Sequence, residues 1–548
     1  MRKTSLLALV GVLAIVASLL IGPGASAQPA GPAKAAAGTV VFVHDQEPPN
    51  LQGPWVGNNL YATSLVLNNI WYGCQIRNDK GDFVPRLCAS KPQLIKRSPL
   101  TVRFTYKTSA KWSDGKAVTG KDFRATWKVF TNPANNVISR TGWEDIKSVS
   151  GTGKTVTVVF KTLYADWESL VSSGPYPAHY IAGRDMNQTF LNDTGGLSSG
   201  PWKFGGWQKG VQITVTRNAA FAAGPKMKLD RVVFRYILDT NARFQALKAN
   251  EGQVMEPQPQ LQIADFLKDR KFVVDRKIGF AWEHIDIQFG AQGHPALKQR
   301  YIRQALITGM NRTQIANALY GTIAPGLKPV NSHMFKPFES AYRPNWSSYT
   351  FSQTKVISSL KAKGCTGGPN TPSANNSAIW TCPNVGKLSF RFGTTTGNQL
   401  RALTFEIIQR QLKSVGIELL ARFQVAGTLF GTTLPSHDWD LIMFTWVGSP
   451  ATPITIKDLY ACGGDQNDMG YCNKAFSTIL NKVAVTLSAS ERATLLNAAE
   501  KKYMVPDVPS IPVYARPVFV IRSAKVSGPV VNPTTEGSPW NANVWSTS

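Results

Sequence analysis

The chain has 548 residues, of which 43% are apolar and 17% are charged, and its formal net charge is +27. This length exceeds what one hydrophobic core supports, so we expect a soluble globular protein of two or three domains. A strong positive charge suits nucleic acid, but the Lys and Arg residues are scattered and no nucleic-acid-binding module is recognisable. Nucleic acid is therefore not expected as a partner.

The N-terminus has the three parts of a secretion signal. Arg2 and Lys3 are basic, residues 6–21 form an apolar run, and small residues lead up to Ala27. We expect cleavage after Ala27, and no lipid anchor because no cysteine lies near this site. The apolar run is short for a membrane span, and no other segment is long enough.

The mature chain is therefore expected to be secreted or extracytoplasmic. Residues 28–38 are rich in Ala, Pro and Gly, which predicts a flexible lead-in without a fold of its own. Removing Arg2 and Lys3 lowers the net charge from +27 to +25. This charge favours non-specific contact with an anionic cell surface.

The first predicted elements are a strand at residues 39–44 and an apolar helix at 61–71, joined by a loop. In open α/β sheets, ligands bind beyond the carboxyl ends of the strands. The loop follows such an end, so its polar and aromatic residues Trp55, Asn58 and Asn59 are predicted to contact a ligand.

Residues 111–130, KWSDGKAVTGKDFRATWKVF, combine a tight turn with a helix start. Thr119 precedes Asp122 by three residues, as a capping box requires, ahead of an apolar face that includes Phe123. The preceding strand alternates, and a further strand is predicted at residues 155–160.

A parallel βαβ unit is predicted further along the chain. After Gly200-Pro201-Trp202 and a strand at 211–216, a second strand covers 232–238 and Thr240 is placed to cap a helix at 243–249. A strand at 254–255 completes the unit.

These segments resemble the extracytoplasmic solute-binding proteins that supply ABC importers with peptides, the oligopeptide and dipeptide binders of bacterial solute-binding protein family 5. The similar motifs are Trp-Ser-Asp-Gly at 112–115, Gly200-Pro201-Trp202 and Arg217-Asn218. Comparable matches at 303–306 and 439–441 extend the resemblance from about residue 39 to the C-terminus.

The resemblance implies a two-lobed α/β fold of the periplasmic-binding-protein class, type II, with the extra subdomain of the peptide binders. Two crossing segments would join the lobes, which close around a ligand like a hinge. We expect lobe one at residues 39–75, 196–284 and 501–548, an inserted subdomain at 76–195, and lobe two at 285–500.

Patterns in the second half of the chain predict the elements of lobe two and the return to lobe one. Asn311 is expected to cap the first of the helices. The predicted helices cover 312–320 and 400–415, and the predicted strands cover 388–392, 417–423, 441–446, 511–514 and 518–521.

The six cysteines form three local pairs, which in an exported protein predict disulfides. The expected pairs are Cys74 with Cys88, Cys365 with Cys382, and Cys462 with Cys472. No pair has zinc spacing and no His lies at ligand spacing, so neither a metal nor a cofactor is expected.

The strand at 441–446 and its continuation form the second predicted ligand segment. In peptide-binding relatives a Trp here is followed three residues later by an Asp that pairs with the peptide α-amino group, and adjacent backbone groups pair with the peptide. The resemblance therefore implies ligand contacts from Thr445, Trp446, Val447 and Ser449. Trp446 matches the Trp, but Ser449 occupies the Asp position.

This difference changes the expected ligand. An enclosed ammonium without a carboxylate partner costs several kcal/mol, so we expect that the protein does not read a free peptide N-terminus in the usual way. Blocked or longer peptides and non-peptide solutes such as glycans remain open.

The predicted function is that of a substrate-binding component of an ABC importer, monomeric, which delivers its solute to a membrane permease and ATPase complex. The alternatives are a binder of a non-peptide solute and a surface receptor without a transporter. A secreted hydrolase is not expected: Ser198 lies in a Gly-x-Ser-x-Gly match, but the elements around it do not suit a nucleophile elbow.

Overall fold

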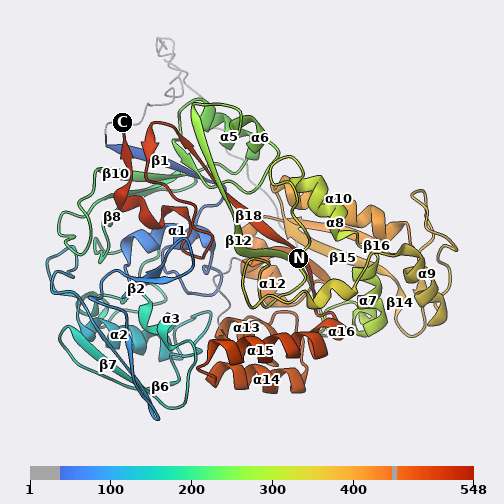
Figure 1. The fold of residues 1–548 in the computed structure, drawn as a ribbon, viewed down its shortest axis with the longest axis horizontal. Helices are drawn as coiled ribbons and strands as arrows, with labels where there is room; N and C mark the ends of the chain where they lie inside the picture. The colour runs from blue at the N-terminus through green and yellow to red at the C-terminus, as the bar shows by residue number, and fades with distance from the viewer. Residues whose placement is uncertain (1–37, 447–452) are drawn as a thin grey trace, which may run out of the picture. The chain divides into compact units, whose positions relative to one another are not determined.

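The computed structural model describes residues 38–446 and 453–548, shown in Figure 1. Its largest sheet has ten strands in the order β16-β15-β17-β12-β18-β11-β1-β10-β9-β8. The strands within the segments expected for lobe one are β1 (Thr39–His44), β8 (Trp202–Gln208), β9 (Gln212–Arg217), β10 (Arg231–Tyr236) and β11 (Val254–Met255). Those within the segment expected for lobe two are β15 (Ser389–Thr395), β16 (Glu418–Gln424) and β17 (Leu441–Trp446).

Two long antiparallel strands, β12 (Phe272–Ile287) and β18 (Ser510–Ser523), lie between these groups and pair along most of their length. Figure 1 shows them side by side. The pairing shifts between Ile278 and Trp282, so that residues 279–281 face Arg516 alone as a bulge. The predicted boundary between residues 284 and 285 falls inside β12.

The prediction of two separate late strands was wrong, because β18 is one strand. Pro517 interrupts the sequence pattern but not the strand. It faces Ile278 at the edge of the bulge, where a proline is tolerated.

The predicted βαβ unit is present, with β10 and β11 both parallel to β1. Its helix α5 (Thr240–Lys248) begins earlier than expected. The cap is Asp239, whose side chain accepts a hydrogen bond from the Ala242 backbone N–H at 2.8 Å. The prediction that Thr240 caps this helix was therefore wrong; its hydroxyl accepts a hydrogen bond from Arg243.

The inserted subdomain has its own antiparallel sheet, made of β4 (Gln93–Arg97), β5 (Leu100–Thr105), β7 (Thr155–Phe160) and β6 (Ile146–Ser150). The predicted capping box starts α2 (Gly120–Thr131): the Thr119 N–H donates to the Asp122 carboxylate at 2.8 Å. Phe123 of this helix is fully buried and packs edge-on against Phe104 of the sheet.

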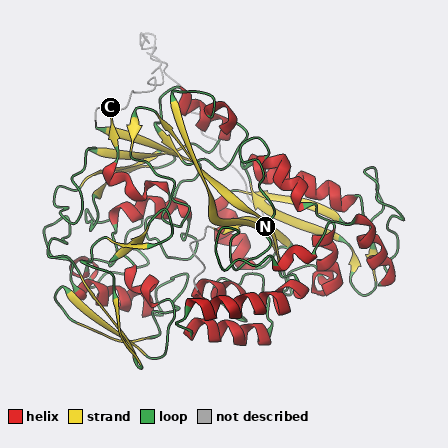
Figure 2. Cartoon of the chain, viewed as in Figure 1, coloured by secondary structure: helices red, strands yellow, loops and turns green. Residues whose placement is uncertain are grey.

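Helices and short strands complete the fold, as Figure 2 shows by colour. The remaining helices of the first half are α1 (Tyr61–Ile70), α3 (Trp167–Ser172), α4 (Ala178–Ile181) and α6 (Ile263–Phe266). Those of the second half are α7 (Arg300–Thr308), α8 (Arg312–Tyr320), α9 (Gln353–Ala362), α10 (Gln399–Lys413), α11 (Ala426–Thr428), α12 (Leu434–Ser436), α13 (Pro453–Tyr460), α14 (Lys474–Val485), α15 (Ala489–Ala499) and α16 (Val505–Asp507). The short strands are β2 (Gln75–Arg77), β3 (Phe83–Pro85), β13 (Thr381–Cys382), β14 (Gly386–Lys387), β19 (Val526–Ser527) and β20 (Ser546–Thr547). Asn311 caps α8 as predicted.

The three predicted disulfides are present: Cys74–Cys88, Cys365–Cys382 and Cys462–Cys472. Across the two described ranges, no group of three or more His, Cys, Asp or Glu side chains is arranged to hold a metal ion. None of the helices described is both long and apolar enough to cross a membrane. The predicted signal at 1–27 and nearly all of the lead-in lie outside the described residues.

Candidate ligand-binding site

At the end of β17, side chains of β17, β12 and β18 lie in a row. We call β12 and β18 the crossing strands. Trp446 is half-buried and lies directly opposite Trp282 of β12, which in turn faces Ala515 of β18. The Trp446 ring stacks on the buried ring of His284 at 5.9 Å between centroids. This row lies beside the bulge at 279–281, where the lobe-two part of the sheet ends. Trp446 is therefore placed at a carboxyl strand end next to the connection between the lobes.

Thr445 belongs to a cluster of hydrogen-bonded polar side chains. Its hydroxyl donates to the carboxylate of Glu283 and accepts a hydrogen bond from Arg401 at 3.0 Å, and Arg401 also donates to Glu283 at 2.6 Å. Burial alone would raise the pKa of Glu283, but the charge and hydrogen bond of Arg401 outweigh it and hold the pKa below its ordinary value. Thr445 thus helps to satisfy a buried ion pair that the sequence analysis missed.

The lobe-one loop buries two of its three predicted ligand residues. Trp55 is 3% exposed and its indole N–H donates to Asn187 at 3.0 Å, while Asn58 is 1% exposed. Asn59 is exposed. In this structure Trp55 and Asn58 support the loop itself, which leaves Asn59 as the accessible member of the three. Val447 and Ser449 lie outside the described residues.

A lysine that no sequence pattern indicated lies against the row. The Lys336 ammonium is 3.7 Å from the centroid of the Trp282 ring, and the residue is 3% exposed. Burial lowers the pKa of Lys336 to about 8, against the opposing effect of Glu339 and Glu500. Lys336 and Trp282 are 54 positions apart, so only the fold brings them together.

Hydroxyls of the inserted subdomain contact carboxylates that follow β17 in the chain. The Ser139 hydroxyl lies 2.8 Å from Asp465 and 3.3 Å from Asp458, and the Thr141 hydroxyl lies 3.2 Å from Asp458. A cavity of about 360 Å³ adjoins these side chains. Burial, reinforced by the like charge of Asp465, raises the pKa of Asp458 to about 6.

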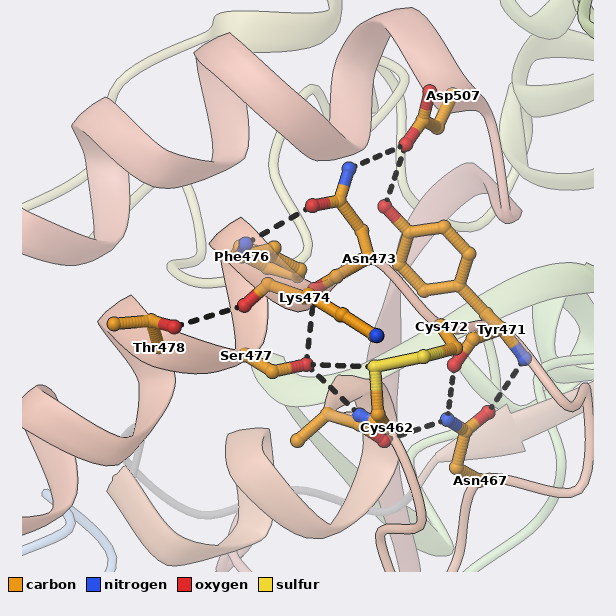
Figure 3. Close-up of a disulfide and its surroundings, with 11 residues drawn as sticks. Cys462, Asn467, Tyr471, Cys472, Asn473, Lys474, Phe476, Ser477, Thr478 and Asp507 are labelled. Carbon is orange, nitrogen blue, oxygen red and sulfur yellow. Dashed lines mark hydrogen bonds between the residues drawn. A yellow bond between two sulfur atoms is a disulfide. The ribbon is translucent and has the colours of Figure 1, made fainter.

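The disulfide Cys462–Cys472, drawn in Figure 3, closes a loop. Asp465 lies within this loop. The Asn467 side-chain amide donates to the carbonyls of Ala461 and Tyr471, at 2.7 Å each, and so ties the two ends of the loop together. Asp458 lies on α13, which begins directly after residues 447–452. The chain thus passes from Trp446 to both carboxylates within twenty residues.

Ser198 does not form a nucleophile elbow. It is fully buried, and its hydroxyl donates to the Trp202 carbonyl at 2.6 Å and accepts from the Gly200 N–H at 3.0 Å. These hydrogen bonds stabilise a turn. The nucleophile of an elbow is instead exposed at the top of a sheet.

Known proteins resemble this chain in sequence and in fold. The sequence model of bacterial extracellular solute-binding proteins, family 5 (middle region), matches residues 82–468. The oligopeptide-binding protein OppA of Mycobacterium tuberculosis (strain ATCC 25618 / H37Rv) is 23% identical over 531 residues, which cover 89% of this chain and 85% of OppA.

Two solved structures share the fold. The periplasmic EDTA-binding protein EppA has a TM-score of 0.82 at 20% identity, covering 94% of this chain and 97% of its own. The oligopeptide-binding protein AppA from Bacillus subtilis, in complex with a nonapeptide, has a TM-score of 0.82 at 19% identity, covering 94% of this chain and all of its own. The fold is thus the two-lobed α/β fold of these binding proteins.

Proposed function

The chain belongs to family 5 of the bacterial extracellular solute-binding proteins, and on this basis we propose that it captures a peptide or a related solute between its two lobes and delivers it to an ABC permease. The function is binding without catalysis. Contacts between the solute and both lobes stabilise the closed conformation, which the permease recognises.

The observation that carries this proposal is the position of Trp446. It lies at the end of β17, beside the bulge that separates the lobe-two pairing of β12 and β18 from the lobe-one pairing. A solute stacked on Trp446 would lie at the point about which the lobes move. Asn59 is the exposed candidate on the lobe-one loop.

The experiment is to purify the secreted protein, denature it and identify the released small molecules by mass spectrometry. A set of short peptides of mixed sequence is the expected result. A single non-peptide solute would contradict the peptide proposal. Trp446→Ala should abolish capture, whereas Trp207→Ala, on edge strand β8, should retain it.

A second candidate is a non-peptide solute, and one observation favours it. Residues 447–452, VGSPAT, contain no acidic residue, so the position where peptide-binding relatives carry an Asp offers no partner for an α-ammonium group. Equal affinity for a free and an N-acetylated peptide would show that the site does not recognise the α-ammonium group.

The finer assignments complete the proposal: a monomer that contacts a permease and ATPase complex, is cleaved after Ala27 and carries no lipid anchor. N-terminal sequencing of the secreted protein tests the cleavage site. Detergent-phase partitioning tests the anchor, and co-purification with membranes at low and high salt separates a specific partner from attraction to anionic surfaces.

A further inference from the structure

Lys336 reaches the row of Trp446, Trp282 and Ala515 through a segment that extends the sheet. Pro329 bridges to Tyr514, and the Val330 N–H donates to the Val513 carbonyl at 3.3 Å. Val330 then packs with Trp282 and Ala515. This pairing fixes the start of the segment on β18, six residues before Lys336.

The Lys336 ammonium is buried without a direct ion pair, although Glu339 and Glu500 lie near it. Its one hydrogen bond goes to the His333 carbonyl at 3.2 Å, and within residues 38–446 and 453–548 no carboxylate forms an ion pair with it. Glu339 lies near but accepts from the Lys336 backbone N–H, at 2.6 Å. The cation–π contact with Trp282 compensates part of the ammonium charge. An ammonium group has three donors, so donors remain.

A second buried donor lies in the same place. The Trp282 indole N–H is buried and has no hydrogen-bond partner among the described residues. Buried polar groups in native proteins are nearly always paired, so an orphan donor beside a half-buried ligand candidate is available to an acceptor from outside the chain. The ammonium lies over the ring that carries this N–H, so the two donors are close together.

We propose that Lys336 and Trp282 form a carboxylate subsite beside Trp446, and that the captured solute places a carboxylate there. The inference rests on the proposed function and names the chemistry of one end of its ligand.

A carboxylate fits these donors because an ionised carboxylate only accepts hydrogen bonds, while a lysine ammonium and an indole N–H only donate them. Its negative charge would also pair with the buried ammonium, which makes the hydrogen bond stronger than one between neutral groups. The missing acid at position 449 is consistent with this reading, since the site would then select an anionic rather than a cationic end of the solute.

The direct test uses acetate, the smallest carboxylate, and needs no knowledge of the solute. The indole ¹⁵N–H resonance of Trp282, assigned from Trp282→Phe, is followed during titration of acetate into the full secreted protein. A saturable shift that disappears in Lys336→Met is expected. No saturable shift, or an unchanged shift in Lys336→Met, would overturn the subsite.

The second arm uses peptides and separates the two proposals. A mixed library of short peptides is offered once as free acids and once as C-terminal amides. Preference for the acids of at least tenfold, lost in Lys336→Met, is expected. Amides retained only when they contain Asp or Glu would assign the subsite to a side-chain carboxylate. Equal retention of acids and amides without acidic side chains would overturn the inference but leave peptide binding intact.

Failure of both libraries would contradict the proposed peptide function, and the acetate titration would still decide on the subsite. Lys209 provides a matched control, because its ammonium lies 3.3 Å from the Trp207 ring but is exposed on lobe one. Lys209→Met should leave the acetate shift and the acid preference unchanged. Trp282→Phe removes the indole N–H together with the pyrrole ring but keeps an aromatic side chain. If Lys336→Met folds poorly, this variant tests the second donor through the acid preference of the peptide library.

Discussion

The Ser139 hydroxyl donates a hydrogen bond to the Asp465 carboxylate at 2.8 Å, across 326 positions of sequence. This contact joins the inserted subdomain to the disulfide-closed loop that follows α13. A backbone hydrogen bond from Ala165 to Ala484, at 2.7 Å, joins the inserted subdomain to α14, the helix that follows this loop. A further contact links lobe two to lobe one: the side-chain amide of Asn398 donates to the side-chain oxygen of Gln258 at 3.1 Å. If the lobes separate when the solute leaves, these contacts break, so their strength contributes to the affinity for the solute.

Removing the two hydroxyls should weaken solute binding. Ser139→Ala with Thr141→Val removes donors to Asp458 and Asp465, and each net hydrogen bond contributes about 1 kcal/mol. We expect a five- to thirtyfold loss of affinity, measured by calorimetry. The matched control is Thr105→Val, which removes a hydroxyl contact within the subdomain sheet and should leave affinity unchanged. If the double variant binds the solute as tightly as the unchanged protein does, these hydrogen bonds do not depend on closure of the lobes.

Asp458 should make stability depend on pH in the acidic range. Its pKa is raised from 3.8 to about 6, so the folded state binds a proton more tightly than the unfolded state. The raised pKa reflects the destabilisation of the ionised carboxylate by the fold. The free energy of unfolding should therefore rise as pH falls from about 6 towards 4. The expected gain over that window is about 1–3 kcal/mol, and Asp458→Asn should remove it in urea titrations.

Asp468 is the comparison for this effect. Its pKa is also raised to about 6 by burial and by the charge of Asp286, against the opposing effect of His437. Asp468→Asn should alter the pH dependence of unfolding in the same direction. It should leave the solute affinity unchanged, because Ser139 and Thr141 contact Asp458 and Asp465 instead. An unchanged pH dependence of unfolding in Asp468→Asn would contradict this expectation.

The ion pair of Glu283 and Arg401 should be costly to break. Both side chains are less than a tenth exposed, so Glu283→Gln leaves a buried guanidinium without its counterion. We expect a loss of about 3–5 kcal/mol in the free energy of unfolding, measured by urea denaturation. Asp230→Asn breaks the exposed pair with Arg217 and should cost no more than about 1 kcal/mol. Similar losses in both variants would mean that water reaches Glu283.

Opening the disulfide Cys462–Cys472 should affect binding as well as stability. Replacing both cysteines by serine is expected to cost about 2–3 kcal/mol of stability. The loop also presents Asp465 to Ser139, so solute affinity should fall too. The same change at Cys365–Cys382, which lies elsewhere in lobe two, should reduce stability alone. Loss of affinity in both variants would indicate a general loosening of the fold.

Local patterns predicted much of the fold, because the signals involved span few residues. The capping box at Thr119 and Asp122 and the strand ending at Trp446 need only a helix turn or an alternating run. The cap of α5 was misplaced by one residue because Asp239 and Thr240 both suit that position, and only the backbone decides.

Local patterns did not predict the crossing strands β12 and β18 as single strands. β12 contains a charged stretch, Asp275-Arg276-Lys277, and β18 contains Pro517, so neither reads as one strand in isolation. Their pairing across more than two hundred positions determines both. The same holds for the site: Trp446 follows from the family pattern, whereas Lys336 and Arg401 gain their positions from tertiary contacts that leave no local trace.

The ten-stranded ladder also has a thermodynamic consequence. Strands of both lobes share backbone hydrogen bonds through β12 and β18, so melting one lobe would expose the paired edge of the other. We therefore expect the lobes to unfold together in one calorimetric transition. The largest hydrophobic cluster also joins residues of both lobes, such as Val43 and Phe392. We expect movement between the lobes to be absorbed at residues 279–281 instead, where the pairing of β12 with β18 is already interrupted.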